Sequence, residues 1–279
     1  MTGLIIHRSV TYVLNLNCYP CPEPGPNGSL TTNHIIKVQQ ELRSTEAGLR
    51  TLPGTDIKNT RTGEIIYTPP QDHKTIIKLM TNLERFINDD EMADLDPLVK
   101  MAIIHYQFES IHPFYDGNGR TGRIINILYL VLKDLLDLPI LYLSRYITQN
   151  KADYYNGLQN VRDNNDWENW LLFMLQSVEV AANQANDLIK EIRSLIMSMK
   201  HSIRERLPKI YSQDLLNNIF RHPYTKVAYL KRDIDVTDKT ARKYLDLLAE
   251  HDFLKKEIHK GNSYYINTGL FNLLLDVSR

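Results

Sequence analysis

The chain has 279 residues but only two cysteines, which limits what disulfides or thiolate-bound metals can contribute. Cys18 and Cys21 stand in a Cys-Tyr-Pro-Cys segment that leads into a proline-rich loop. This spacing is that of a redox or half-zinc motif, but no paired His or Cys stands nearby to complete a zinc site. We interpret the pair as two thiols in a loop, too close in the chain for a disulfide to constrain much of the fold.

The chain also lacks an excess of charge and a segment that could span a bilayer. Lys+Arg and Asp+Glu each number 33, so no overall field draws the protein to nucleic acid or to a membrane. The early apolar run Leu4–Leu16 is too short and too polar to cross a bilayer, and it lacks the basic start of a signal peptide. We therefore expect a cytoplasmic protein without a membrane partner.

Helix caps and helical periodicity dominate the first three quarters of the chain. Asp96-Pro97, for example, is a strong helix start, because an N-cap acid precedes a proline at the first helical position. The predicted helices cover residues 31–50, 70–88, 96–110, 119–136, 150–164 and 166–206. Between the first two, residues 58–70 predict a β-hairpin with Asn59–Gly63 as its turn. The expected fold class is therefore mainly α, with a small hairpin.

A different pattern follows Leu207-Pro208. Three short predicted helices, at 212–221, 225–233 and 238–251, precede two β-rich stretches, at 253–258 and 263–266. This order is typical of a winged helix. The expected organisation is a segment at 1–30, a helical domain at 31–207 and a winged-helix domain at 208–279. Residues 209–279 contain 12 Lys+Arg against 9 Asp+Glu, so acidic residues offset most of the positive charge that DNA binding would need. This domain could therefore contact either DNA or protein, and both alternatives stay open.

Residues 112–123, HPFYDGNGRTGR, collect the side chains that phosphate chemistry uses, between two apolar helical stretches. His112 can act as a general base near neutral pH, and Asp116 can hold Mg²⁺. The turn Gly117-Asn118-Gly119 can form a nest of backbone N–H groups for an anion. Arg120 and Arg123 can clamp phosphate oxygens with charge-assisted bonds. Each residue alone has an ordinary structural explanation, but together they favour phosphoryl or nucleotidyl transfer.

The same segment resembles the Fic family signature HPFx(D/E)GNGRxxR at every fixed position. The flanking segments IHYQFESIHPF, LYLSRYI and DYYNGLQNVR also resemble the family, over roughly residues 30–205. The resemblance implies a compact helical core that transfers AMP from ATP to a Ser, Thr or Tyr hydroxyl of a target protein, in a Mg²⁺-dependent reaction. It implies that His112 is the base, that Asp116 holds the metal and that Phe114 anchors the loop.

Two further sets of residues follow from this resemblance. The expected nucleotide- and phosphate-binding residues are Gly117, Asn118, Gly119, Arg120, Thr121, Gly122, Arg123 and Tyr154. The expected flap, which aligns the target segment by strand addition, comprises Gly63, Glu64, Ile65, Ile66 and Tyr67. Tyr155, like Tyr154, is a candidate to stack on the nucleotide base, although tyrosines in a helix more often belong to the core.

The transferred group and the regulation are less constrained. Doc-type relatives, which transfer the γ-phosphate, carry Lys in place of Gly119 and usually Ala in place of Gly117, so this chain favours AMP. Relatives that transfer UMP or phosphocholine share the loop closely. A regulator that senses nucleotide and binds DNA through the winged helix is the non-enzymatic alternative. The target protein and a homodimer stay open.

The inhibitory pattern (S/T)xxxE(G/N) of many Fic proteins has no match here. Glu168-Asn169 has the right ending, but Asn164 stands four residues before the glutamate. Three explanations stay open: the inhibitory helix lies upstream of the given sequence, a partner supplies it, or the enzyme is uninhibited. Because Leu4–Leu16 looks like an interrupted family segment, we favour the first. A chain extended upstream should then show lower AMP transfer.

Overall fold

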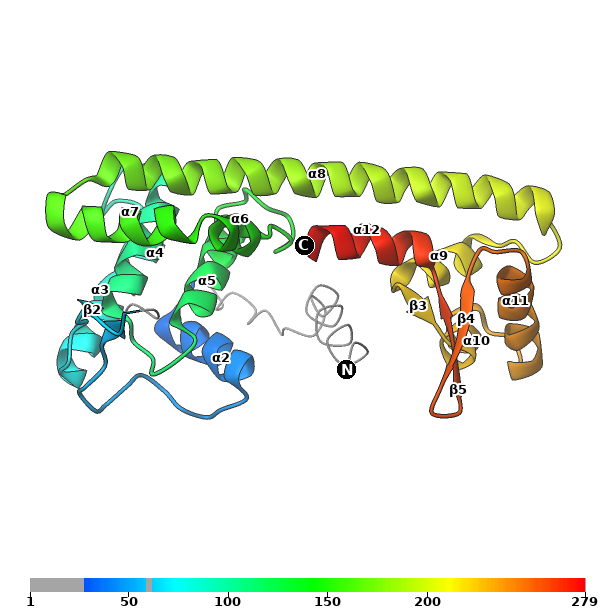
Figure 1. The fold of residues 1–279 in the computed structure, drawn as a ribbon, viewed down its shortest axis with the longest axis horizontal. Helices are drawn as coiled ribbons and strands as arrows, with labels where there is room; N and C mark the ends of the chain where they lie inside the picture. The colour runs from blue at the N-terminus through cyan, green and yellow to red at the C-terminus, as the bar shows by residue number, and fades with distance from the viewer. Residues whose placement is uncertain (1–27, 59–61, 279) are drawn as a thin grey trace. The chain divides into compact units, whose positions relative to one another are not determined.

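A computed structural model describes residues 28–58 and 62–278 (Figure 1). The chain divides into two compact units between residues 182 and 183, and the two are treated separately below. The segment Leu4–Leu16, the cysteines Cys18 and Cys21 and the predicted turn residues 59–61 lie outside the described residues. Within the described residues, no helix is both long and apolar enough to cross a membrane.

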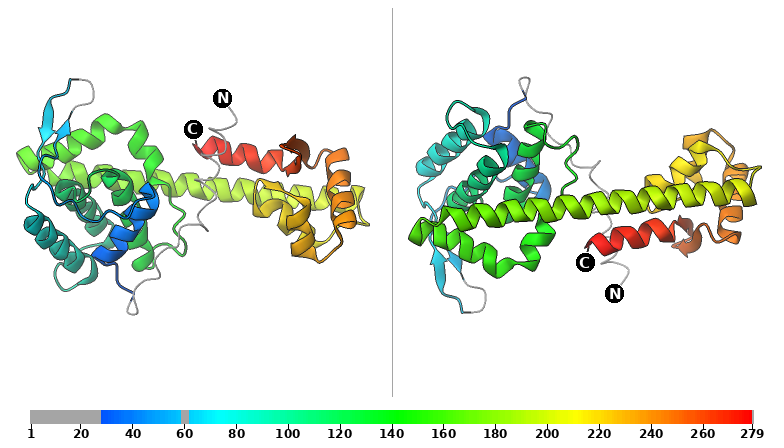
Figure 2. Two further views of the ribbon diagram at one scale, coloured as in Figure 1. Left: turned by 90° about the horizontal axis from the view of Figure 1, so that it is seen from below. Right: turned by 90° about the horizontal axis from the view of Figure 1, so that it is seen from above.

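The first unit is built from helices around one apolar core. Its helices are α2 (Thr32–Arg43), α3 (His73–Asn88), α4 (Pro97–Ile111), α5 (Asn118–Leu132), α6 (Leu143–Gln149), α7 (Lys151–Asn164) and the first turns of α8 (Trp167–Arg206). Strands β1 (Ile57–Lys58) and β2 (Ile65–Tyr67) form an antiparallel hairpin that stands out from the helices (Figure 2). The prediction of a mainly helical domain with a small hairpin is confirmed.

Local sequence explains where the main helices begin. Thr31 accepts a hydrogen bond from the His34 N–H and the His34 ring accepts one from the Thr31 N–H, which closes a capping box before α2. Asp96 caps α4 through the Leu98 N–H, at 2.8 Å, with Pro97 at the first helical position. Side-chain oxygens thus satisfy N–H groups that have no partner inside the helix.

Helices α4 and α5 form the centre of this unit, and α4 is buried on every side. Phe108, Ile125 and Trp170 are fully buried around their contact, and the Trp170 indole donates to the Ala102 carbonyl at 3.0 Å. The loop that carries the signature joins these two helices. Its position is therefore set by the best-packed part of the unit.

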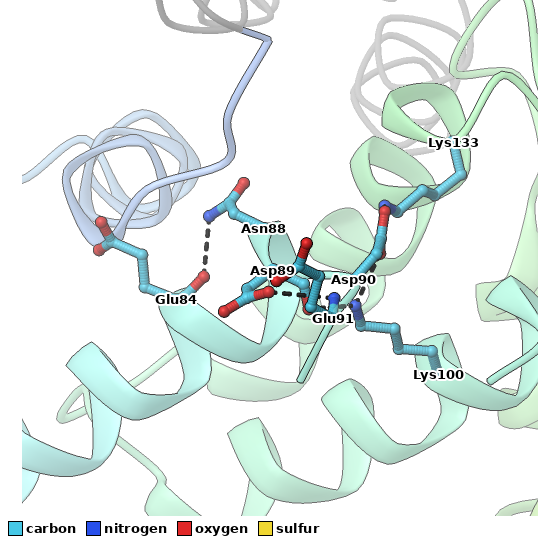
Figure 3. A network of polar contacts seen from close by, with 7 residues as sticks. All are labelled: Glu84, Asn88, Asp89, Asp90, Glu91, Lys100 and Lys133. Atoms are coloured by element: carbon cyan, nitrogen blue, oxygen red, sulfur yellow. Dashed lines mark hydrogen bonds and ion pairs between the residues drawn. The ribbon is translucent and has the colours of Figure 1, made fainter. Parts of the chain in front are cut away.

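A buried lysine ties three helical segments together (Figure 3). Lys100 of α4 has only 1% of its side chain exposed, and its ammonium donates to the Asp90 carboxylate at 2.9 Å and to the Asp89 carbonyl at 3.1 Å. Lys133, just after α5, contacts the same carboxylate at 2.5 Å. These bonds lower the pKa of Asp90 and compensate the burial of a cation. The network lies at the end of α4 opposite to His112.

Several predicted boundaries were wrong. Helix α2 ends at Arg43 rather than near residue 50, because Ser44 takes a left-handed conformation and returns its N–H to the last turn. Helix α5 ends at Leu132 because left-handed Asp134 lets the Leu135 N–H bond the Leu130 carbonyl, at 2.9 Å. Helix α6 was not predicted. Such endings depend on single residues in unusual backbone conformations, which periodicity does not show.

The second unit contains the end of α8 and a helix-and-sheet module. Its elements are α9 (Gln213–Arg221), β3 (Tyr224–Thr225), α10 (Val227–Ile234), α11 (Asp238–Glu250), β4 (Lys255–His259), β5 (Asn262–Ile266) and α12 (Thr268–Ser278). The sheet has the order β3-β5-β4, all antiparallel. Leu216, Leu245 and Tyr265 lie in its core. The predicted winged-helix pattern is confirmed, while β3 and α12 were missed.

Candidate active site

The loop between α4 and α5 borders a cavity of about 410 Å³. The lining residues are His112, Tyr115, Asp116, Gly117, Asn118, Gly119, Arg120, Arg123, Ile147, Thr148, Lys151, Tyr154 and Tyr155. Cavities of this size hold small ligands such as nucleotides. The structure thus brings together the predicted base, the predicted metal ligand, the glycine turn and both arginines around one space.

His112 ends α4 in a left-handed conformation, with φ 47° and ψ 59°. Burial lowers the pKa of its imidazole to about 4, and the charges of Arg50 and Arg162 act in the same direction. The Glu109 carbonyl and the Asp116 carboxylate oppose this shift. His112 is therefore neutral at pH 7 and can accept a proton there.

Phe114 and Asn118 fix the shape of the loop. The Phe114 ring is fully buried, as expected of a loop anchor, with its ring centroid 6.3 Å from that of Phe108. The Asn118 side chain donates to the Phe114 carbonyl at 2.7 Å and accepts from the Phe114 N–H at 2.9 Å. Since these bonds occupy the Asn118 side chain, the backbone N–H of Asn118 is the group left for an anion.

The amino end of α5 is built to face an anion. Its N-cap is Gly117, which has φ 85° and supplies no capping side chain. The first N–H groups of the helix therefore lack an intrahelical or capping partner, and the helix dipole adds positive potential at the same point. Arg120 and Arg123 project from this first turn and a half into the cavity lining. The Arg123 guanidinium is fixed by Ser144 of α6, because its Nε donates to the Ser144 hydroxyl at 2.8 Å.

Asp116 is the carboxylate of the cavity, with 60% of its side chain exposed. One oxygen lies 2.8 Å from the Arg43 guanidinium, and the other accepts from the Gly117 N–H at 2.6 Å. Among the described residues, no three His, Cys, Asp or Glu side chains gather to hold a metal. A single exposed carboxylate fits a Mg²⁺ ion that takes its remaining ligands from substrate phosphates and water. It does not fit a resident metal enclosed by protein.

Thr121 and Gly122 do not line the cavity. Thr121 is fully buried within α5. Gly122 faces α4, where an added Cβ would lie 2.8 Å from Glu109 Oε1 and 3.1 Å from the Phe108 ring. The absence of a side chain at Gly122 thus lets α4 and α5 approach closely, and this contact holds the amino-terminal part of α5 against the end of α4 that carries His112.

A second layer of polar groups lies behind the cavity wall. Tyr154 lines the cavity and also belongs to this second layer. Its ring packs in the aromatic core, and its hydroxyl lies 2.9 Å from the ring of buried His105. Burial raises the pKa of the Glu109 carboxyl to about 7, although Arg123 and Arg162 oppose the shift. Burial also lowers the pKa of His105 to about 3. Glu109 can therefore change its charge near neutral pH beside the arginine that closes the signature.

The hairpin presents an open edge. Ile57 pairs with Tyr67 and Lys58 with Ile65. Ile65 and Ile66 are 53% and 41% exposed, and Gly63 and Glu64 are exposed as well. In the described part of the chain β2 pairs with β1 alone, so its other edge offers free backbone groups to an added strand.

Sequence reasoning missed several residues around the cavity. Thr148 and Lys151 line it from the α6–α7 corner, and Arg50 contacts the loop from the segment after α2. The first two follow LYLSRYI, a segment that resembles the family, so their position could have been suspected. No pattern in the sequence pointed to Arg50.

Comparison with known families agrees with this geometry. Residues 29–130 match the sequence profile described as Fic/DOC family, and residues 195–270 match that of the C-terminal domain of the SoFic-like protein adenylyltransferases. The chain is a Fic/DOC family protein. The predicted family is thereby confirmed, with a C-terminal module of the SoFic-like kind.

Relatives of this Fic/DOC protein are similar over part of their length. Protein adenylyltransferase fic-1 of Caenorhabditis elegans is 29% identical over 91 residues, which is 32% of this chain and 16% of the relative. Protein adenylyltransferase Fic of Drosophila erecta is 28% identical over 141 residues, or 49% of this chain and 27% of the relative. The chain therefore spans well under a third of the length of these curated relatives.

A solved structure extends the similarity in fold. The crystal structure of a Fic family protein from Desulfovibrio desulfuricans G20 aligns with 94% of this chain and 74% of its own, with a TM-score of 0.51 and 20% identity. At this identity the likeness shows the fold. It covers both the helical unit and the C-terminal module of the Fic/DOC protein.

Proposed function

We propose that this chain is a protein adenylyltransferase that transfers AMP from ATP to a hydroxyl of a target protein. The observation that carries the proposal is the cavity itself, where neutral His112 shares one space with Asp116, the Gly117 turn, Arg120 and Arg123. A base beside an anion site is the combination that nucleotidyl transfer to an alcohol requires. The relatives named protein adenylyltransferase support the same choice.

The proposed reaction is a displacement at the α-phosphorus. The target oxygen forms a bond to this phosphorus, the bond from phosphorus to the oxygen that bridges to the β-phosphate breaks, and pyrophosphate leaves. Because Nδ1 of His112 is buried and the imidazole contacts the Glu109 carbonyl, Nε2 is the ring nitrogen proposed to take the hydroxyl proton. Backbone N–H groups of Gly117–Gly119 and the two arginines carry the phosphate charge.

Mg²⁺ held by Asp116 would supply charge neutralisation between the phosphates. Arg43, whose guanidinium lies 2.8 Å from one Asp116 oxygen, would share that carboxylate with the ion. The exposed β2 edge is proposed to receive an extended target segment as an added strand, with its hydroxyl directed to His112. Thr121 and Gly122, which were expected to bind phosphate, are instead proposed to support α5, and Tyr154 is proposed to form part of the nucleotide-facing wall.

Paired labelling of ATP tests the reaction. With Mg²⁺ and a cell extract as the source of target, label in the α-phosphate should appear on protein and label in the γ-phosphate should not. Transfer of γ-label alone would identify a phosphotransferase, and transfer of neither would contradict both enzymatic functions. Label in the base of UTP provides the matched test of nucleotide choice, because UMP transfer would carry it onto protein.

Three further expectations stay predictions. They are the cytoplasmic location, the division at residue 207 between catalytic and winged-helix domains, and DNA or protein contact through the second unit. Lys239, Arg242 and Lys243 are exposed along α11 and form no ion pair among the described residues, so this surface is the one to mutate in a DNA-binding assay. Binding without transfer would favour the regulatory alternative.

A further inference from the structure

Arg50 is a fully buried arginine in the segment between α2 and the hairpin. In the part of the chain that the structure describes, no carboxylate lies within ion-pair distance of its guanidinium. A buried cation without an acid is costly unless neutral acceptors surround it. What Arg50 contacts therefore indicates why the position holds an arginine.

The contacts of Arg50 converge on the carboxyl end of α4. Its Nε donates to the carbonyl of His112 at 2.9 Å, and one Nη donates to the carbonyl of Ile111 at 3.5 Å. Helix α4 leaves these carbonyls without intrahelical partners, and the negative end of its dipole lies there. The guanidinium therefore caps the helix at the residue that carries the proposed base.

The same nitrogen that reaches Ile111 also donates to the carbonyl of Pro70, which follows the hairpin. Arg50 thus joins the base of the flap to the backbone of His112 through a single side chain. A second link runs in parallel, because the Tyr67 hydroxyl of β2 donates to the Ser110 carbonyl at 2.8 Å. The flap and the end of α4 are thus tied together at three successive carbonyl groups, those of Ser110, Ile111 and His112.

The backbone of the Arg50 segment braces the signature loop as well. The Arg50 N–H donates to the Pro113 carbonyl at 2.9 Å, and the Arg50 carbonyl contacts the His73 ring at 2.8 Å. The Thr51 and Leu52 N–H groups both lie 2.9 Å from the Tyr115 hydroxyl. This bracing holds both sides of buried Phe114.

The backbone of His112 needs such support. A left-handed conformation is unfavourable for a non-glycine residue, because its Cβ crowds the following carbonyl oxygen. A return to the right-handed conformation would rotate the His112 peptide and change the path of the chain from α4 into the signature loop. The Arg50 bond to the His112 carbonyl opposes that rotation, and Arg50 itself does not line the cavity.

We propose that Arg50 is a positioning residue that locks the His112 backbone and the base of the flap into one unit, so that the target hydroxyl and its base meet in register. The catalytic part of this inference rests on the proposed function. The structural part does not, because the coupling of flap and α4 exists without any reaction.

Hydrogen exchange followed by mass spectrometry tests the coupling directly. In Arg50→Met, peptides covering residues 62–71 and 108–116 should both exchange faster, by about tenfold. Arg50→Lys should give a smaller change, because an ammonium keeps the charge but cannot place the planar fork on separate carbonyls. These readings need no activity, so they stand even if the wild-type chain transfers no AMP.

Lys100→Met is the matched control, because it removes another buried cation from α4 at the end remote from His112. It should increase exchange around residues 89–100 and leave peptides 62–71 and 108–116 unchanged. If Arg50→Met alters neither of these two peptides, or if Lys100→Met alters both equally, Arg50 does not couple them.

Activity then separates positioning from substrate binding. Arg50→Met should slow AMP transfer at saturating ATP roughly 100-fold through misplacement of the base, while the Kd for ATP stays within about threefold, a change of less than 1 kcal/mol. Lys100→Met should preserve the transfer rate below its melting temperature. An Arg50→Met protein with a wild-type rate would overturn the role in positioning.

Discussion

The two units of this protein treat their buried polar groups differently. Among the described side chains of residues 183–275, each buried polar one is paired: Asn218 bonds Asp233 and Thr225, and Asn267 bonds the Ile219 carbonyl and the Leu270 N–H. In the described part of residues 28–182 several buried polar atoms have no described protein partner. Those near the signature are Gln39 Oε1, Arg50 Nη1, Glu109 Oε1, Ser110 Oγ, His112 Nδ1, Thr121 Oγ1 and Arg162 Nε.

This difference matches a division between chemistry and architecture. Native proteins rarely leave buried polar atoms without a partner, and the exceptions often mark catalytic groups or water sites. The helical unit concentrates such atoms on both sides of the α4–α5 contact. In the C-terminal module the described buried polar atoms have hydrogen-bond partners, as expected of an interior that serves only to keep the module folded. Five substitutions test whether this comparison holds, in order of decreasing effect.

The largest effect is expected at His112. His112→Ala should reduce AMP transfer by about 10²–10⁴-fold, the usual contribution of a general base. It should lower stability by no more than about 1.5 kcal/mol, the usual contribution of one hydrogen bond, because the described polar contact of the imidazole within the fold is with the Glu109 carbonyl. Transfer is measured from α-labelled ATP and stability by thermal melting.

Asn267→Ala is the counterpart in the second unit. It should lower the free energy of unfolding by about 1–3 kcal/mol, since the Ile219 carbonyl loses its partner. Below its melting temperature it should retain the transfer rate. Equal losses of activity in both variants would remove the distinction between the units.

The next effect concerns the contact between α4 and α5. Gly122→Ala should cost about 1–3 kcal/mol through overpacking against Glu109 and Phe108, and should slow transfer by shifting the end of α5. Gly48→Ala is the control, because its Cβ would meet nothing within 4 Å. Chemical denaturation gives both values, and a neutral Gly122→Ala would show that the two helices can separate freely.

The smallest effect is a difference in pH dependence. Folding raises the pKa of Glu109 from 4.5 to about 7, so the folded state binds the extra proton between these values and Glu109 destabilises the fold as pH rises through them. At pH 8 the Glu109→Gln variant should therefore have a higher melting temperature than wild type, with a free energy of unfolding larger by about 1 kcal/mol or more. This difference in stability should disappear as the pH falls toward 5.

Asp246 of the second unit should behave in the opposite way. Burial raises the pKa of its carboxyl, but bonds from Lys256 and Tyr265 outweigh this and lower it overall. Asp246 therefore stabilises the fold at neutral pH and loses that effect as pH falls through its folded pKa. Asp246→Asn should melt lower than wild type at pH 7, and the gap should narrow in acid. The same sign in both variants would contradict the contrast between the units.

Much of the fold followed from local pattern. Caps such as Thr31 and Asp96 placed helix starts correctly, because a capping side chain and the N–H groups it satisfies lie within one turn of the chain. Helix ends at Arg43 and Leu132 were misplaced, because each depends on whether one residue turns left-handed. Strand β3, only two residues long, is defined by its pairing with β5 and carries no pattern of its own.

For the site, local sequence shows which reactive side chains are available. Residues 112–123 contain the proposed base, the proposed metal-binding carboxylate, the glycine turn and both arginines, and they lead into the start of one helix. The properties of these groups depend on the folded structure. The low pKa of His112, the assignment of Gly122 to helix packing and the bracing by Arg50 all arise from groups distant in the chain. Burial and long-range hydrogen bonds depend on what packs against a residue, and a local sequence does not contain that information.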